Sequence, residues 1–190
     1  MDKSITRRWL VANVIGLVVG MLSFGAIADS GWAEAPKLLN VGAHLLGFLA
    51  FGAMLAYLQR WALAASRTPF LVWAAALSLV QFLAYGLAFE LVGPPWDFIA
   101  GIVALGATTG LLLRRETVRP NHRWLVAKGA LAGVAAVVGM IPVFVVAGPI
   151  NDAMGGGFAP FMVILALIGG VCGVAIGSLL RPGRTVTAAA

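Results

Sequence analysis

The sequence predicts an all-α, polytopic membrane protein with six transmembrane helices, and three observations carry this prediction. The chain has 190 residues, of which 61% are hydrophobic and only 11% are charged, whereas a soluble domain is about 25% charged. The apolar residues form six long stretches separated by short linkers. The Lys and Arg residues fall almost entirely in alternate linkers. A soluble chain this apolar could not cover itself with polar surface, and a bilayer removes that requirement.

Each apolar stretch is close to the ~20 residues that an α-helix needs to cross the hydrocarbon core of a bilayer. Strands of a membrane barrel would alternate apolar and polar residues, so helices are expected. The expected spans are Trp9–Ala28, Leu38–Leu58, Phe70–Leu91, Trp96–Leu113, Trp124–Val146 and Phe161–Leu180. Pro142 should kink the fifth span toward its outer end. Because the linkers are short, we expect one membrane domain over residues 1–190.

The distribution of charge predicts a multi-pass protein of the cell membrane with both termini in the cytoplasm. Eleven of the 13 Lys and Arg residues lie in four segments, at the two ends of the chain and in the second and fourth linkers. They are Lys3, Arg7, Arg8, Arg60, Arg67, Arg114, Arg115, Arg119, Arg123, Arg181 and Arg184. The opposite linkers hold Lys37 as their one cation and carry Asp29, Glu34 and Asp152, with Glu90 and Asp97 at their edges. Lys and Arg accumulate on the cytoplasmic side of membrane proteins, which gives this orientation.

The net charge of +6 does not indicate nucleic-acid binding, because the basic residues flank the spans and form no stripe with aromatic side chains. The expected partners are the lipid bilayer and other membrane subunits or a second copy of the chain. Cys172, the one cysteine, lies within the sixth span and is expected to be a small packing residue. Phosphate-binding loops, zinc-protease motifs and nucleophile elbows are missing. We therefore expect no enzymatic activity, no cofactor and no metal.

The first span has one alternative interpretation. Met1–Arg8 has the charge of a signal-peptide n-region, and Ala26–Ala28 resembles a cleavage site. The apolar run is long for a signal peptide, and an internal repeat makes this span one of a set. We therefore expect it to remain as a helix of the protein.

The ends of the spans predict three repeated helical hairpins. Arg8–Ala12 is identical in sequence to Arg123–Ala127, and Arg67–Val72 is a looser version. The even spans share small residues and an arginine at intervals of four: Gly52-x-x-x-Ala56-x-x-x-Arg60, Gly106-x-x-x-Gly110-x-x-x-Arg114 and Gly173-x-x-x-Gly177-x-x-x-Arg181. The hairpins would cover about residues 1–62, 63–117 and 118–184, followed by a tail at 185–190. The repeat predicts a bundle with approximate threefold symmetry.

Small residues four apart lie on one face of a helix, where they let two helix backbones approach closely. On this basis, helix packing is assigned to Gly52, Gly106, Gly110, Gly173 and Gly177. Packing within the chain is the simpler interpretation, and a contact with a second copy is the alternative.

Polar residues near the outer ends of the second, third and fourth spans form a candidate ligand-binding site. Asn40 and His44 share one face of the second span, Glu90 ends the third span, and Asp97 begins the fourth. Ionisable groups inside a membrane are costly and often mark functional sites. The alternative is that water at the headgroup level solvates them, since most lie at helix ends.

Arg8, Arg123 and Lys128 form a second candidate site near the cytoplasmic ends of the first and fifth spans. Basic pockets between helices bind lipid phosphates. The alternative is that these long side chains extend to the interface without a specific ligand.

Two functions remain open. The first is a non-catalytic helix-packing scaffold or accessory subunit of a membrane assembly. The second is a small-molecule transporter or substrate-binding subunit with an outward-facing polar pocket. Six helices in 190 residues is similar in size to the substrate-binding membrane subunits of energy-coupling-factor vitamin transporters. This resemblance concerns helix number and length alone.

Overall fold

The computed structural model describes residues 3–28, 36–64, 66–93, 96–116 and 124–181, and nearly all of them are α-helical. The helices are α1 (Lys3–Ala28), α2 (Lys37–Leu63), α3 (Phe70–Val92), α4 (Trp96–Glu116), α5 (Leu125–Gly139), α6 (Ile141–Ala153) and α7 (Phe158–Leu179). Among the described residues, five segments are long and apolar enough to cross a membrane, and α3 adds a shorter apolar stretch, Phe70–Gly86. These helices confirm the predicted all-α fold of a polytopic membrane protein.

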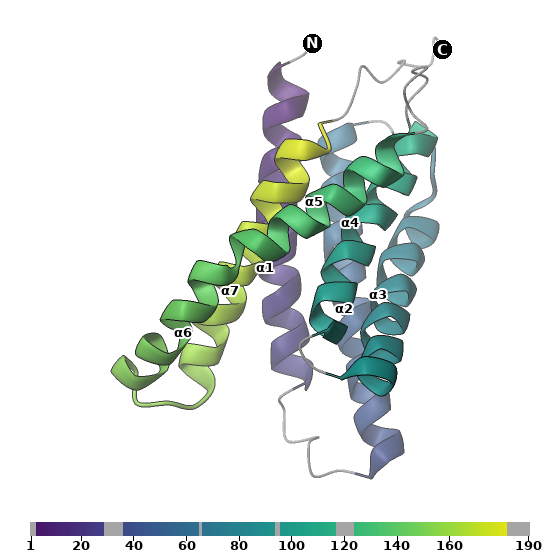
Figure 1. Ribbon diagram of the computed structural model, residues 1–190. Helices are drawn as coiled ribbons and strands as arrows, with labels where there is room; N and C mark the ends of the chain where they lie inside the picture. Colours follow the sequence, from purple (N-terminus) through teal and green to yellow (C-terminus); the bar gives the residue numbers. More distant parts are fainter. Residues whose placement is uncertain (1–2, 29–35, 65, 94–95, 117–123, 182–190) are drawn as a thin grey trace.

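Six of the helices form a closed circuit of contacts. Each of α1 to α4 contacts the next helix along the chain, α5 contacts α7, and α7 returns to α1. Figure 1 shows the first and last helices running along each other although they are far apart in sequence. The two ends of the described chain therefore build one interface of the bundle.

The fifth predicted span is longer than expected and is interrupted. Its residues form α5 and α6, which meet at Met140 and together extend from Leu125 to Ala153. Pro142 lies in the first turn of α6, where its missing N–H costs no helical hydrogen bond. Because Pro142 has no N–H group, it cannot donate the next hydrogen bond of α5, and the helix is interrupted just before it.

The α6 helix and the adjoining half of α7 project from the bundle as a hairpin (Figure 1). The turn between them is formed by Gly155–Gly157, whose φ angles are 75°, 75° and 88°, a region that side chains disfavour. Asn151 and Asp152, which precede this turn, belong to the end of α6.

Large apolar side chains lie both inside the bundle and on its outer surface. Trp9, Leu55 and Trp73 are fully buried, whereas Leu71 and Val145 expose 76% and 71% of their surface. Water would disfavour so much exposed apolar area, but lipid tails are as apolar as leucine. The surface is therefore that of a protein surrounded by lipid.

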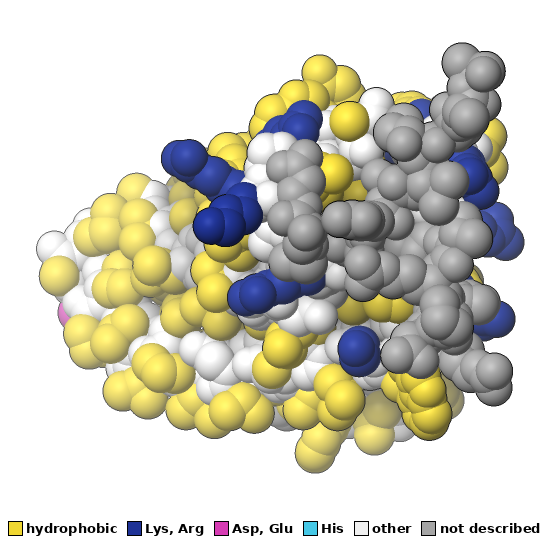
Figure 2. Space-filling view, turned by 90° about the horizontal axis from the view of Figure 1, so that it is seen from above, with side chains coloured by type: hydrophobic (Ala, Val, Ile, Leu, Met, Phe, Trp, Pro, Cys, Tyr) yellow, Lys and Arg dark blue, Asp and Glu magenta, His cyan; other side chains and the backbone are white. Residues whose placement is uncertain are grey.

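Cationic side chains gather at one end of the bundle, which Figure 2 shows from above. The start of α1, the α2–α3 connection and the ends of α4 and α7 meet there (Figure 1). The described cations in these segments are Lys3, Arg7, Arg8, Arg60, Arg67, Arg114, Arg115 and Arg181. The cationic segments that the sequence predicts on one side of the membrane thus lie together at one end of the bundle.

Positions that the predicted repeat makes equivalent have similar surroundings. Gly52 of α2 packs against α3, Gly106 of α4 against α5, and Gly173 of α7 against α1. Each thus faces the helix that follows in the circuit. The residues three positions further along are all fully buried: Leu55, Thr109 and Ile176. The threefold repeat stays a prediction from the sequence.

Candidate functional site

Two of the residues in the predicted ligand site, Asn40 and His44, lie on α2 toward the end opposite the cations. Nδ1 of His44 is 2.9 Å from the backbone oxygen of Asn40, so this interaction stays within one turn of the helix. The imidazole ring meets the ring of Phe24 on α1 edge to face, with the centroids 6.0 Å apart. His44 is therefore a half-buried ring packed between two helices.

Asp97, in the first turn of α4, exposes only 4% of its surface. The hydroxyl group of Tyr85 on α3 lies near its carboxylate. The N-terminal end of a helix also stabilises a negative charge. Asp97 is thus a buried carboxylate where α4 meets α3. The side chain of Glu90, the remaining residue of the predicted site, lies outside the described part of the structure.

A series of aromatic contacts runs from His44 to Tyr85. The ring of Phe48 on α2 lies 4.6 Å from that of Phe24 and 5.8 Å from that of Tyr85, measured between centroids. The predicted ligand site stays a prediction. Among the described residues, no group of three or more His, Cys, Asp or Glu side chains is placed to hold a metal ion.

A buried chain of hydrogen bonds joins α1, α2 and α3 near the cationic end. Nε2 of Gln59 donates to Oδ1 of Asn13 at 2.8 Å, and Nε1 of Trp73 donates to Oε1 of Gln59 at 3.0 Å. Nδ2 of Asn13 donates to the backbone oxygen of Trp9 at 2.8 Å. All of these side chains are fully buried. A polar residue inside a span signals such a bond, but the sequence does not reveal its partner helix.

Glu116, at the end of α4, binds the connection between α2 and α3. Its carboxylate accepts hydrogen bonds from the N–H groups of Arg67 and Thr68 at 2.8 and 2.9 Å and from Oγ of Ser66 at 3.0 Å. Such charge-assisted bonds are stronger than neutral ones. Glu116 is absent from the predicted sites. Its position as an acidic residue in an arginine-rich linker is a sequence feature that could have singled it out.

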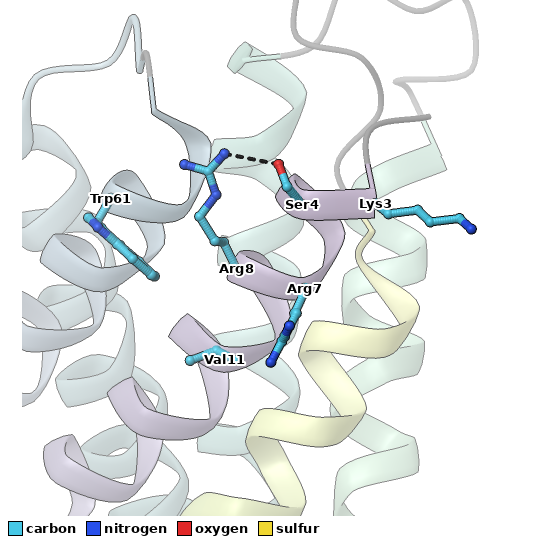
Figure 3. A pocket seen from close by; sticks show the side chains of 6 residues that line it. All are labelled: Lys3, Ser4, Arg7, Arg8, Val11 and Trp61. Carbon is cyan, nitrogen blue, oxygen red and sulfur yellow. Dashed lines mark hydrogen bonds between the residues drawn. The ribbon is translucent and has the colours of Figure 1, made fainter.

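An open groove of about 560 Å³ lies between the first turns of α1 and the end of α2. Its lining residues are Lys3, Ser4, Arg7, Arg8, Val11 and Trp61 (Figure 3). Five of the six come from α1, where spacings of three and four place them on one face. Among the described residues that line the groove, three are cationic and none is acidic. The groove therefore combines positive charge with an apolar side.

Of the residues predicted to bind a lipid phosphate, only Arg8 lines this groove. Lys128 is an exposed residue of α5 and is not part of the lining. Arg123 lies outside the described residues. The structure instead brings Arg8 together with Arg7 on the same helix and Trp61 from α2 (Figure 3).

The glycines assigned to helix packing all lie at contacts between helices of this chain. A methyl group on Gly106 would overlap the backbone oxygen of Gly129 in α5, and one on Gly173 would overlap the backbone of Val14 in α1. Of the other assigned glycines, Gly52 faces α3, Gly110 faces α5 and Gly177 faces α1. These faces are occupied within the chain, so a contact with a second copy would need another surface.

The fold and these contacts define a polytopic helical membrane protein whose helices are held by glycine contacts and buried polar bonds. No protein-family model matches the chain, and no curated protein or solved structure matches it either. Its function is therefore inferred from the geometry of its surfaces.

Proposed function

We propose that this chain is a non-catalytic module of the cell membrane, a scaffold or accessory subunit that binds a transmembrane helix of another chain. The observation that carries this proposal is an apolar groove of about 550 Å³ between α5 and α7. The groove is lined by small and branched residues: Ala135, Gly139, Ala166, Leu167, Gly170, Val171, Val174 and Ala175. It opens on the outer surface, where the hairpin of α6 and α7 leaves the bundle.

Close packing, rather than apolar burial, drives the association of helices in lipid, and small residues permit it. Ala166, Gly170 and Val174 are four residues apart on α7 and share one face. No heavy atom lies within 4 Å of the position that a Cβ of Gly170 would occupy. The backbone of α7 is therefore open at this point to the approach of another helix.

The polar groups of the interior support a structural role over transport. Gln59 donates a hydrogen bond to Asn13 and accepts one from Trp73, and Gln81 donates one to the backbone of Gly101. A transport pathway needs polar groups that can exchange partners with a substrate. These groups instead hold the helices together.

Gly170→Leu tests the proposal, because a Cβ at this position meets no neighbouring atom within 4 Å and the larger side chain would extend into the groove. With a photoreactive amino acid at Leu167, we expect the otherwise unaltered chain to form one discrete cross-linked protein product in native membranes. Gly170→Leu should lose this product while its thermal unfolding stays unchanged. The mass of the product distinguishes a second copy from another subunit.

Gly42→Leu, at an open glycine of α2, is the matched control and should retain the product. The proposal is wrong if no discrete product forms, or if Gly170→Leu retains it. The transport alternative predicts that His44→Ala or Glu90→Gln abolishes uptake or ligand-dependent thermal stabilisation while expression persists. The scaffold proposal predicts that both variants keep the cross-linked product.

A further inference from the structure

We infer that the groove between α1 and α2 binds the phosphate of an anionic phospholipid, whose acyl chains continue along the outer surface of these two helices. The site comprises Arg7, Arg8 and Trp61, with Lys3 adding positive charge (Figure 3). This inference concerns a different surface from the α5–α7 groove and does not depend on the proposed function.

The cationic part of the groove has free donor capacity for a phosphate. Nη2 of Arg8 donates to Oγ of Ser4 at 3.1 Å, and a guanidinium group has five N–H donors in total. Figure 3 shows Arg7 one residue before it on the same helix, while the Lys3 side chain extends away from Trp61. The lining residues that the structure describes contribute three positive charges and no negative one. The N-terminal end of α1 adds a further positive potential.

The ridge of α1 along the groove changes from charged to apolar. Lys3, Arg7, Val11 and Ile15 follow one another at intervals of four and therefore share one face. Val11 exposes 38% of its surface, and Ile15 is exposed as well. Two cations at the end of the bundle are thus followed by two apolar side chains toward its middle. A phospholipid has the same order, with its phosphate outside and its acyl chains inside.

The α2 side of the groove contributes aromatic side chains suited to the headgroup region of a membrane. Trp61 lines the groove and exposes half of its surface, and Tyr57, one turn closer to the middle of the bundle, is exposed too. Tryptophan and tyrosine are enriched at the headgroup level of membranes. Free inorganic phosphate would use the cations alone and would leave these apolar surfaces without a role. The groove therefore fits an anionic lipid better than a soluble anion.

The test is a titration of the detergent-solubilised full-length protein with phosphatidylglycerol, with bound lipid counted by native mass spectrometry. The double variant Arg7→Gln/Arg8→Gln should bind roughly 30-fold more weakly than the unaltered chain, from the usual contribution of each cation near an anionic lipid. Arg114→Gln/Arg115→Gln removes the same charge from exposed arginines of α4 at the same end and should change binding less than about 3-fold. Arg7→Lys/Arg8→Lys, which keeps the charge, should stay close to the unaltered chain. If the double Gln variant does not fold, Arg7→Gln alone serves, since Arg7 is exposed.

Four results would overturn the inference. Equal losses in the α1 and α4 double variants would mean general attraction to a cationic surface. Equal binding of phosphatidylcholine would remove the role of the negative charge. Displacement of phosphatidylglycerol by inorganic phosphate at the same concentration would identify a soluble anion as the ligand. Trp61→Ala is expected to weaken lipid binding, and unchanged binding would refute the apolar part of the site.

Discussion

Single polar side chains hold α1, α2 and α3 together at the cationic end. Gln59 donates to Asn13 and accepts from Trp73, so it bonds to a helix on either side. Apolar burial does not favour one helix neighbour over another in lipid, because the tails are equally apolar. Directional bonds such as these therefore help to select which helices are adjacent.

Gln59→Leu is expected to reduce the free energy of unfolding by about 1–3 kcal/mol, because it leaves the indole N–H of Trp73 and the amide oxygen of Asn13 buried without a partner. Unfolding by denaturant in micelles measures the change. Gln81→Leu is the matched control. Its Nε2 donates to the backbone oxygen of Gly101 at 2.8 Å, so the loss is one bond of about 0.6 kcal/mol. Equal effects of the two substitutions would contradict the role given to Gln59.

At the scale of helices, glycines set the distance between neighbours. Gly106 of α4 lies directly against Gly129 and Gly133 of α5, and Gly173 of α7 lies against Val14 of α1. Backbones in direct contact gain dispersion and weak Cα–H···O interactions along the whole interface. These contacts become available only because the glycines lack a Cβ.

Gly106→Ala is expected to destabilise the protein by about 1–3 kcal/mol, because the added methyl group overlaps the backbone of α5, which cannot move aside as a flexible side chain can. Thermal unfolding in micelles measures the effect. Gly86→Ala on α3 makes the same change at a glycine with no neighbour within 4 Å. Since alanine favours a helix over glycine by up to about 1 kcal/mol, this control should be neutral or stabilising. Destabilisation of similar size in both would refute the packing argument.

At the scale of the whole molecule, the two ends of the bundle differ in charge. The cationic end carries the start of α1 and the ends of α4 and α7, and the glycine turn between α6 and α7 lies away from it (Figure 1). Cations preferentially face the cytoplasm, so this turn should face the outside of the cell.

Cysteine labelling tests this orientation. Cys172 is the one cysteine of the chain and is fully buried, so it should contribute little background. Met154→Cys in the α6–α7 turn should react with a membrane-impermeant maleimide in intact cells. Arg115→Cys at the end of α4 should react only after permeabilisation. The reverse pattern would show that the predicted orientation is wrong.

The all-α membrane fold follows from the sequence by itself, because a lipid environment requires helices of a certain length and composition. For the same reason, the predicted third span, Phe70–Leu91, ends within one residue of the observed helix α3, Phe70–Val92. The fifth predicted span ends at Val146, whereas α6 continues to Ala153, because hydropathy does not give the residue at which a helix ends. Hydropathy and charge are local properties of the sequence. A local pattern is therefore sufficient to predict the membrane fold and the position of the third span.

The tertiary structure alone decided which residues meet. Gln59 bonds to Asn13 and Trp73, and Glu116 accepts from three donors of the α2–α3 connection. Arg8 and Trp61 line one groove although they are distant in sequence. The sequence predicts a polar pocket that includes His44 and Asp97, and this pocket stays a prediction. The sequence does not reveal the ring contacts that Phe48 of α2 makes with Phe24 of α1 and Tyr85 of α3. Such contacts depend on which helix lies beside which and on the rotation of each helix about its axis. Both are set by the packing of all the helices together.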